Sequence, residues 1–372
     1  MKMLLIEDCC EILDSQRVPI TSTNRVKGNY PYYGANGIQD YVADYIFDDE
    51  LVLLAEDGGN FGSKERPIAY RVSGKCWVNN HAHVLKPKTG LDVDYLCYSL
   101  MFYNTDGLVN GATRQKLTQA TMKKMQIPER NIEEQNKIVK TLNKTKSIIT
   151  HRRTQLEKLD LLVKARFVEM FGTLLKNPNN YPITTIAEVC SLIKDGTHQT
   201  PEYTDDIEEG YKFLSSKDVM SQKIDWSNIK YIPQTLHEKL YSTLKPQKND
   251  ILMSKNGVNY GVAAVNDTEE VFDIYVSLAL LRPLDIINPI FFRCAINNPD
   301  TKMQFDGSIK GIGVPNLHLG EIKKTKILLP PLNEQKEYVT FVKQVDKSRV
   351  VVQKALDEAQ LLFDSLMQEY FG

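Results

Sequence analysis

The chain has 372 residues, of which 42% are hydrophobic and 25% are charged, and its 46 basic side chains nearly balance its 47 acidic ones. This composition is typical of a folded protein of two or three domains, and it excludes a fibrous, low-complexity or polybasic chain. The apolar runs are far shorter than the ~18 residues that a membrane helix requires. We therefore expect a cytoplasmic protein without a targeting segment.

The cysteines and histidines predict neither a metal site nor a disulfide framework. The six cysteines include no C-x-x-C pair, the spacing that is typical of zinc ribbons. His81 and His83 are separated by one residue, which predicts that both lie on one face of a strand, as a solvated pair rather than as metal ligands. We expect no metal and no cofactor in this chain.

Residues 1–132 predict a mixed α/β region, which we call head 1, and a long helix follows it. Pro128 precedes Asn131, and the spacing of Asn131 from Glu134 matches a capping box at the start of a helix. From 138 to 170 the core-facing positions recur at alternating spacings of four and three, the 3.5-residue period of a coiled-coil seam. These positions are Ile138, Leu142, Thr145, Ile149, Arg152, Leu156, Leu159, Val163, Arg166 and Met170.

The same order recurs in the second half of the chain. Residues 111–172 and 311–372 align without a gap at an offset of 200, with 14 identities over 62 positions, including Glu134-Gln135 with Glu334-Gln335. Upstream, residues 57–62 resemble 256–261 at an offset of 199, and 6–13 correspond to 186–193 at an offset of 180. The second globular region, head 2, is thus about 20 residues longer, and we assign the addition to loops within 196–231. Its seam is Tyr338, Val342, Val345, Arg349, Val352, Leu356, Ala359, Phe363, Leu366 and Tyr370.

Chain connectivity favours antiparallel pairing of the two helices. A helix from 138 to 170 is about 50 Å long, and head 2 joins its end to the start of the second helix. Parallel helices would require head 2 to bridge that length, whereas antiparallel helices place both attachments at the same end. The expected fold is α/β (α+β): two similar mixed heads joined by an antiparallel coiled coil with pseudo-two-fold symmetry. The alternative is two amphipathic helices, each packed on its own head.

The order of head, helix, head and helix resembles the specificity (S) subunit of type I restriction-modification enzymes. The resemblance is carried by I-P-E-R-N-I-E-E-Q at 127–135 and I-L-L-P-P-L-N-E-Q at 327–335, together with 30–38, 53–62 and D-G-T-H at 195–198. It covers essentially the whole chain. It implies target-recognition domains at 1–132 and 173–332 and coiled-coil helices at 133–172 and 333–372.

The resemblance also implies a function. Each head would read one half of a bipartite DNA target, and the helices would set the spacer and bind methyltransferase (M) subunits, of which we expect two. S-adenosylmethionine, Mg²⁺ and ATP are expected on partner subunits, and the sequence leaves open whether restriction (R) subunits join. Because the heads differ in sequence, the two half-sites should differ as well. A coiled coil about 50 Å long limits the separation of the half-sites to roughly one and a half turns of DNA.

The net charge of the two heads is unusual for a DNA-binding protein, because neither has an excess of basic side chains. Residues 1–132 carry 15 basic and 16 acidic side chains, and residues 173–332 carry 17 and 19. Neutralisation of phosphates normally supplies most of the nonspecific affinity for DNA. We therefore expect the isolated chain to bind DNA weakly and in a salt-sensitive way.

Candidate base-reading residues are polar or basic and lie in loops next to glycine turns. At any single position, a role in forming a turn or a solvated loop explains the residue at least as well as a contact with a base. In head 1 the candidates are Asn60, Ser63, Lys64, Arg66, Asn79, Asn80, Thr113, Arg114 and Gln115. In head 2 they are Thr197, His198, Gln199, Lys217, Lys255, Asn256, Asn259 and Lys310.

Two catalytic patterns are better explained by structure. Asn288-Pro289-Ile290-Phe291 is close to the N-P-P-[YF] loop of amino-methyltransferases, but no methyl-donor loop precedes it, and it predicts a helix start. Asp300 with Glu321 and Lys323 has the loose spacing of a nuclease site, yet it falls in the duplicated segment, where the first copy lacks the acid. We therefore expect a noncatalytic chain. The alternative function is that of a scaffold whose two heads bind other proteins.

Overall fold

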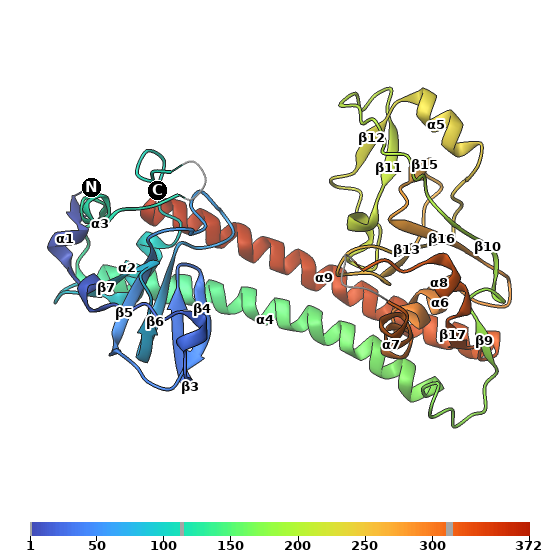
Figure 1. Cartoon of the computed structure of the whole chain (residues 1–372), viewed down its shortest axis with the longest axis horizontal. Coiled ribbons are helices and arrows are strands. Elements are labelled where there is room, and N and C mark those ends of the chain that lie inside the picture. Colours follow the sequence, from blue (N-terminus) through green and yellow to red (C-terminus); the bar gives the residue numbers. More distant parts are fainter. Residues whose placement is uncertain (1, 112–114, 310–314) are drawn as a thin grey trace. The chain divides into compact units, whose positions relative to one another are not determined.

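The computed structural model describes residues 2–111, 115–309 and 315–372. The chain divides into two compact units: unit 1 comprises Met1–Arg153 and Gln353–Gly372, and unit 2 comprises Thr154–Val352. Each unit therefore contains one head and a part of both long helices, and both chain ends belong to unit 1 (Figure 1). Within the described residues, no helix combines the length and the apolar character needed to cross a membrane.

Head 1 is built on a six-stranded sheet in the order β2-β7-β5-β6-β3-β4. Its neighbours are antiparallel except β3 and β6, which are parallel. Val52 and Leu54 enter one hydrophobic core, and Leu51 and Leu53 enter another, because successive side chains of a strand point to opposite faces. The elements are β1 (Met3–Leu5), α1 (Ile6–Cys9), β2 (Cys10–Ile12), β3 (Lys27–Gly34), β4 (Gly37–Val42), β5 (Phe47–Ala55), β6 (Ala69–Val78), β7 (Ala82–Pro87), α2 (Val93–Met101), α3 (Gln119–Lys123) and β8 (Gln126–Pro128), with short 3₁₀ turns at Asp14–Gln16 and Ser22–Asn24.

Head 2 divides the corresponding strands between two sheets, with the orders β10-β16-β13-β14 and β12-β11-β15. Ile251 and Met253 enter one core and Leu252 enters the other, as in head 1. The elements are β9 (Ile183–Thr185), β10 (Cys190–Asp195), β11 (Tyr211–Leu214), a 3₁₀ turn (Ser216–Val219), β12 (Lys230–Ile232), α5 (Gln234–Tyr241), β13 (Ile251–Ser254), β14 (Ala263–Val265), β15 (Phe272–Ile274), β16 (Leu278–Pro283), α6 (Pro289–Ile296), α7 (Pro299–Ser308), α8 (Leu319–Lys324) and β17 (Lys326–Leu328).

Strand registers confirm the repeat that the sequence predicted. In head 1 Leu4 of β1 lies opposite Ile127 of β8, and in head 2 Thr184 of β9 lies opposite Ile327 of β17. These pairs reproduce the offsets of 180 and 200 residues. The two α-helices that follow the sheets match at an offset of 196: Tyr95 of α2 packs against Phe371, and its counterpart Phe291 of α6 packs against Phe171, each pair with ring centroids 5.3 Å apart.

The additional length of head 2 lies in two loops. In head 1 a two-residue turn, 35–36, joins β3 to β4, whereas residues 215–229 join β11 to β12 in head 2. This segment falls inside the predicted stretch 196–231. The rest of the addition was not predicted, because four residues join β4 to β5 but residues 233–250, which include α5, join β12 to β13.

Two helices of 40 residues each, α4 (Ile132–Phe171) and α9 (Leu332–Phe371), follow the two heads. The predicted capping box of α4 is confirmed: the Glu134 amide donates to Asn131 Oδ1 at 2.9 Å, and the Asn131 amide donates to the Glu134 carboxylate at 3.2 Å. Gly172 ends α4 with a φ of 78°, the left-handed conformation that glycine adopts at low cost after a helix.

The predicted seams are confirmed, since every seam residue of both helices is buried or half-buried. The helix segments run antiparallel within each unit. In unit 1 Ile138 and Leu142 share a core with Phe363, and the Arg130 guanidinium contacts the Tyr370 carbonyl. In unit 2 the Tyr338 hydroxyl donates to the carbonyl of Val163 at 3.0 Å. Each unit is therefore a mixed α/β head packed with a pair of antiparallel helix segments.

A buried glutamine fastens each long helix to its head. Gln135 is 2% exposed and Gln335 is 0% exposed. The Gln135 carbonyl accepts from the Asp92 amide at 2.7 Å, and its amide donates to the carbonyls of Gly90 and Arg130. Gln335 makes the matching bonds to the Asn288 amide and to the Ile286 and Pro330 carbonyls. The Glu-Gln dipeptide of the repeat therefore joins the start of each long helix to the start of α2 or α6.

Candidate nucleic-acid interface

Several loops of head 1 meet at one end of its sheet, where β5 ends. The Leu117 amide donates to the Glu56 carbonyl at 2.7 Å, and the Gly58 amide donates to the Gln115 carbonyl at 3.1 Å. The Asn36 side chain, at the tip of the β3–β4 turn, donates to the Gly58 carbonyl at 2.9 Å. The glycine-rich turn 56–62, the segment 115–117 and the hairpin tip thus form one loop cluster.

Head 2 repeats this framework at the end of β13. The Leu317 amide donates to the Lys255 carbonyl at 2.8 Å, and the Gly257 amide donates to the Pro315 carbonyl at 3.0 Å. Gly257 and Gly261 have φ angles of 86° and 84°, like Gly58 and Gly62 at 60° and 75°. Only glycine adopts such angles readily, so the paired glycines of the sequence reflect one turn geometry used twice.

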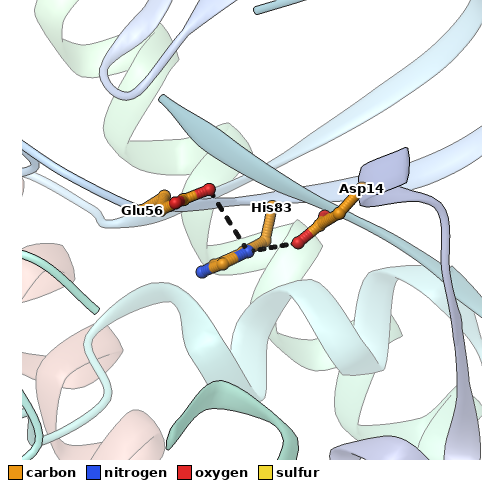
Figure 2. Close-up of side chains that lie close together, drawn as sticks. All are labelled: Asp14, Glu56 and His83. Atoms are coloured by element: carbon orange, nitrogen blue, oxygen red, sulfur yellow. Dashed lines mark hydrogen bonds and ion pairs between the residues drawn. The ribbon is translucent and has the colours of Figure 1, made fainter. Parts of the chain in front are cut away.

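In head 1 a buried ion-pair network supports the cluster (Figure 2). Nδ1 of His83 lies 2.6 Å from the Asp14 carboxylate, and its Nε2 lies 2.9 Å from the Leu117 carbonyl. The Glu56 carboxylate lies 3.7 Å from His83 Nδ1 and accepts from Arg17 at 2.6 Å. Because Glu56 and Leu117 both belong to the loop cluster, the network ties the cluster to the sheet beneath it.

Asp14 is ionised within this network. Burial opposes the charge, but hydrogen bonds from His83 and Gln119 and the nearby imidazole hold the pKa of Asp14 below its ordinary value. Asp14, Glu56 and His83 place one ligand atom each within 4.8 Å of one another, a spacing that could hold a metal ion. Their atoms are already engaged, however, with Arg17 2.6 Å and Lys116 3.1 Å from Glu56. We therefore assign the cluster as a structural ion-pair network.

The prediction of a solvated histidine pair was wrong. His83 is 0% exposed and lies within β7, whereas His81 precedes that strand. Ala82 and Val84 enter one core of head 1, and Leu85 enters the other. Because both faces of β7 are covered, the alternation of residues in this strand does not distinguish a buried face from a solvated one.

In head 2 the charge at the matching position is reversed. Lys255 aligns with Glu56, is 5% exposed, and donates to the Asp195 carboxylate at 2.7 Å. His198 lies 3.4 Å from the same carboxylate. Burial opposes ionisation of Asp195, but the Lys255 hydrogen bond and charge keep its pKa below the ordinary value. The predicted D-G-T-H segment and the predicted Lys255 thus meet at the base of the second loop cluster.

The head 1 candidates lie around the first cluster, in different environments. Lys64 and Arg66 are exposed, and their side chains have no ion pair within the described residues. Ser63 Oγ accepts from the Arg66 amide at 2.9 Å and therefore shapes the turn. Asn79 is 3% exposed, and its side-chain oxygen accepts from the His81 amide. Asn80 and Gln115 are exposed, Asn60 is half-buried, and Thr113 and Arg114 lie outside the described residues.

The head 2 candidates lie in three places. Asn259 and Asn256 belong to the 255–261 turn, where Asn259 is exposed and the buried Asn256 Oδ1 has no partner within the described residues. Thr197, His198 and Gln199 follow β10, and Thr197 Oγ1 accepts from the Gln199 amide. Lys217 lies in the segment 215–229 and donates to the Asn228 carbonyl at 3.0 Å. Lys310 lies outside the described residues.

The catalytic patterns have structural roles. Asn288 caps α6, as predicted, with its side-chain oxygen accepting from the Ile290 amide at 3.0 Å. The Asp300 carboxylate accepts from the Leu174 amide at 2.8 Å, and Glu321 pairs with Lys324 on α8.

Sequence reasoning missed Asp14, Arg17, Glu56, Gln119 and Asn36, which support the cluster in head 1. Gln119 donates to Asp14 across 105 positions of sequence. Usable signals were present for two of these residues, since Asn36 and Glu56 lie in the segments 30–38 and 53–62 that carry the resemblance, and Glu56 aligns with Lys255.

The comparisons with known proteins agree with this architecture. Residues 1–159 and 178–359 match the family described as the type I restriction modification DNA specificity domain, so both copies of the repeat are matched. A Haemophilus influenzae protein, assigned the name of type I restriction enzyme specificity subunit S.HindORF215P, is 28% identical over 98% of this chain and 92% of its own length. The Methanocaldococcus jannaschii type I restriction enzyme MjaVIII specificity subunit is 21% identical over 96% and 89%.

The fold is shared with a solved structure. The S subunit of a type I restriction-modification system from M. genitalium superposes with a TM-score of 0.54 at 15% identity, covering 100% of this chain and 96% of that one. The match of the family model to both halves decides the assignment. The chain belongs to the type I restriction-modification specificity family and is the noncatalytic DNA-specificity subunit of such a system.

Proposed function

We propose that each head reads one half of an asymmetric bipartite DNA target through its loop cluster. One observation carries the proposal: both heads hold their clusters with the same backbone hydrogen bonds, yet Glu56 and Lys255 give the matching positions opposite charge. A constant framework with variable side chains suits the reading of two different sequences. Direct readout requires side chains that reach base edges.

Exposed candidates serve best as base or phosphate contacts. In head 1 we favour Lys64, Arg66, Asn80 and Gln115, and in head 2 His198, Gln199 and Asn259. The buried Asn79 and Lys255 are better suited to holding the loops in place.

Exchange of head 1 with that of a related specificity subunit tests the proposal. The assembled methyltransferase should then modify a hybrid target, with one half-site changed and the other retained. Sequencing of methylated positions in exposed DNA reads the result. An unchanged target would favour the alternative, a scaffold whose heads bind proteins.

The long helices are proposed to set the spacer between the half-sites. Each is continuous over 40 residues, about 60 Å at 1.5 Å per residue. We propose to insert seven residues into both helices, after Arg153 and after Val352, where the two units meet in sequence. The insertion adds two turns of helix, so the preferred spacer should lengthen by roughly three base pairs while both half-sites stay the same. Insertion into one helix alone is the control, because it shifts the seam out of register.

Exposed leucines on the helices are proposed to bind the M subunits. Leu161 and Leu162 on α4 are 63% and 46% exposed, and Leu361 and Leu362 on α9 are 69% and 51% exposed. These pairs are 200 residues apart, so each unit presents one copy. Two copies of one apolar surface suit two M subunits. Replacing one pair by aspartates should remove one M subunit from the complex, and replacing both should remove two, as measured by mass photometry.

A type I specificity subunit acts within a complex with DNA, M subunits and R subunits, and its family binds no cofactor itself. S-adenosylmethionine, Mg²⁺ and ATP are therefore proposed for the partner subunits, and the site of action is proposed to be the cytoplasm, where the DNA lies. Because neither head has a basic excess, the assembled complex should bind its target far more tightly than the chain alone. Tight specific binding by the isolated chain at physiological salt would contradict this.

A further inference from the structure

Unit 2 contains a cavity between α6, the segment 215–229 and the portions of the two long helices that belong to this unit. It is lined by charged, polar and apolar side chains from all four segments. The lining residues that carry the argument are Val163, Lys164, Lys223, Arg293, Cys294 and Asp346.

The repeat shows how this part of unit 2 differs from unit 1. In unit 1 the Tyr98 ring of α2 packs against Phe363 of α9, with ring centroids 6.3 Å apart. At the offsets of the repeat, the corresponding residues of unit 2 are Cys294 of α6 and Val163 of α4, and both line the cavity. Two aromatic rings of unit 1 are thus replaced by two smaller side chains at the wall of the cavity.

A second wall comes from the longer loop of head 2. The Gln222 carbonyl accepts from Arg293 Nη1 at 3.4 Å, and Lys223 lies 3.8 Å from the Asp346 carboxylate. Head 1 has only the two-residue turn 35–36 at the matching position. The cavity is therefore enclosed by residues that the first copy lacks.

Arg293 gives the cavity its chemistry. It is 8% exposed, and its counterpart in α2 is the uncharged Cys97. Within the described residues its Nε has no hydrogen-bond partner, and no carboxylate lies within 4 Å of its guanidinium. Burial opposes its charge, which is compensated among the described residues by a contact of Nη2 with Cys294 Sγ at 3.6 Å and by the charge of Asp346 beyond ion-pair distance. An oxyanion beside the guanidinium would complete this compensation.

The acids that line the cavity pair with other basic residues of the same lining. Asp160 pairs with Arg349, and Asp346 lies 3.6 Å from Arg349 and 3.8 Å from Lys223. Lys164 also lines the cavity and has no ion pair within the described residues. The lining thus contains four basic and two acidic side chains, and neither Arg293 nor Lys164 has a carboxylate within 4 Å among the described residues.

We propose that this cavity binds a phosphate-type oxyanion, held by Arg293 with Lys164 as the second cation. The planar guanidinium offers donors in a fork that matches two oxygens of such an anion. The anion has two sources, free phosphate in solution or a phosphate of the DNA backbone. In either case it would stabilise the junction of head 2 with its helices, a property that head 1 lacks.

The test is thermal unfolding of the full chain in sodium phosphate, compared with sodium chloride at matched ionic strength and pH. Phosphate should raise the unfolding midpoint of unit 2, by about 5 °C at roughly ten times its Kd and further with the logarithm of concentration. Arg293→Met should abolish the rise. Lys248→Ala, which removes an exposed lysine of head 2 that pairs with Glu269, should retain it. A phosphate effect no larger than that of chloride would overturn the proposal.

A second variant keeps the test decisive if Arg293→Met misfolds. The pair Val163→Phe with Cys294→Tyr installs the aromatic residues of unit 1 and fills the cavity without removing Arg293. It should abolish the phosphate response while the far-ultraviolet circular dichroism stays unchanged. A folded filled variant that still responds to phosphate would exclude this cavity as the site.

A DNA-binding measurement distinguishes free phosphate from a phosphate of the DNA backbone. Affinity of the assembled complex for a target duplex is measured with and without phosphate at fixed ionic strength. Competition that disappears in the Val163→Phe/Cys294→Tyr variant identifies a backbone phosphate as the ligand, and equal affinity in both buffers identifies the free ion.

Discussion

The two heads use the same backbone to hold opposite charges. After the central strand of each head, the same two backbone bonds join the glycine turn to the segment that precedes α3 or α8. In head 1 the first turn residue is Glu56, surrounded by Arg17, Lys116 and His83. In head 2 it is Lys255, which pairs with Asp195.

The comparison shows which parts of the repeat are constrained. Backbone bonds, glycine angles and the anchoring glutamines are kept, because each satisfies buried polar groups that would otherwise be costly. The charge beneath the loops is free to change sign, provided that a partner changes with it. A duplicated recognition unit can therefore diverge in what it reads without losing its fold.

The largest effect is expected where the heads are most alike. Gln335→Leu leaves the Asn288 amide and the Ile286 and Pro330 carbonyls without their partner, and should lower the free energy of unfolding of unit 2 by about 3 to 4 kcal/mol. Gln135→Leu should do the same to unit 1. Chemical denaturation measures both. Gln353→Leu, an exposed position of α9, is the control and should change stability by about 0.5 kcal/mol or less. Unequal losses of stability in the two units would show that the two glutamines do not have equivalent roles.

A smaller effect should distinguish the two charge networks. Lys255→Met leaves Asp195 with only the exposed His198 beside it, and should cost unit 2 about 2 to 3 kcal/mol. Glu56→Gln should cost unit 1 less, because Asp14 remains close to Arg17 at 3.5 Å. Adding Asp195→Leu to Lys255→Met should restore most of the loss, as a double-mutant cycle measures. No recovery would mean that the pair is not the cause.

DNA affinity should change by about 1.4 kcal/mol when exposed cations are removed from head 1. Lys64→Ala with Arg66→Ala should weaken target binding by the assembled complex about tenfold. The slope of log affinity against log salt should fall by about one to two. Lys217→Ala in head 2 should matter less, since Lys217 already donates to the Asn228 carbonyl. Fluorescence anisotropy at several salt concentrations gives both values, with Lys354→Ala on α9 as the control. An unchanged slope of log affinity against log salt would show that Lys64 and Arg66 do not contact the DNA.

The smallest effect is a pH dependence shared by the heads. Asp14 and Asp195 both have pKa values held below the ordinary 3.8. Each therefore contributes stability above about pH 4, and that contribution is lost as pH falls through its lower folded pKa. Asp14→Asn and Asp195→Asn should be less stable at neutral pH but flatter below pH 4, in acid titrations followed by circular dichroism. If only one variant flattens the curve, the two networks are not equivalent.

Local and repeated features could be predicted from the sequence. The Asn131 capping box, the seams and the correspondence of Gln135 with Gln335 in the repeat could be predicted, because they depend on residues close in sequence or on a gap-free offset. The network around Asp14 could not be predicted, because it joins residues up to 105 positions apart and each is unremarkable by itself. His83 was misread because β7 is covered on both faces. The base-reading residues stay predictions.

The division of the chain has a consequence for how it folds during synthesis. Unit 2 is one continuous stretch, Thr154–Val352, whereas unit 1 needs Gln353–Gly372 to complete it. Ala359 and Phe363 belong to the core of unit 1, so this core stays open while about 200 further residues are translated. The last segment of unit 2 is therefore synthesised before the segment that completes unit 1. Loss of the final 20 residues would leave unit 2 intact and unit 1 without its last helix segment.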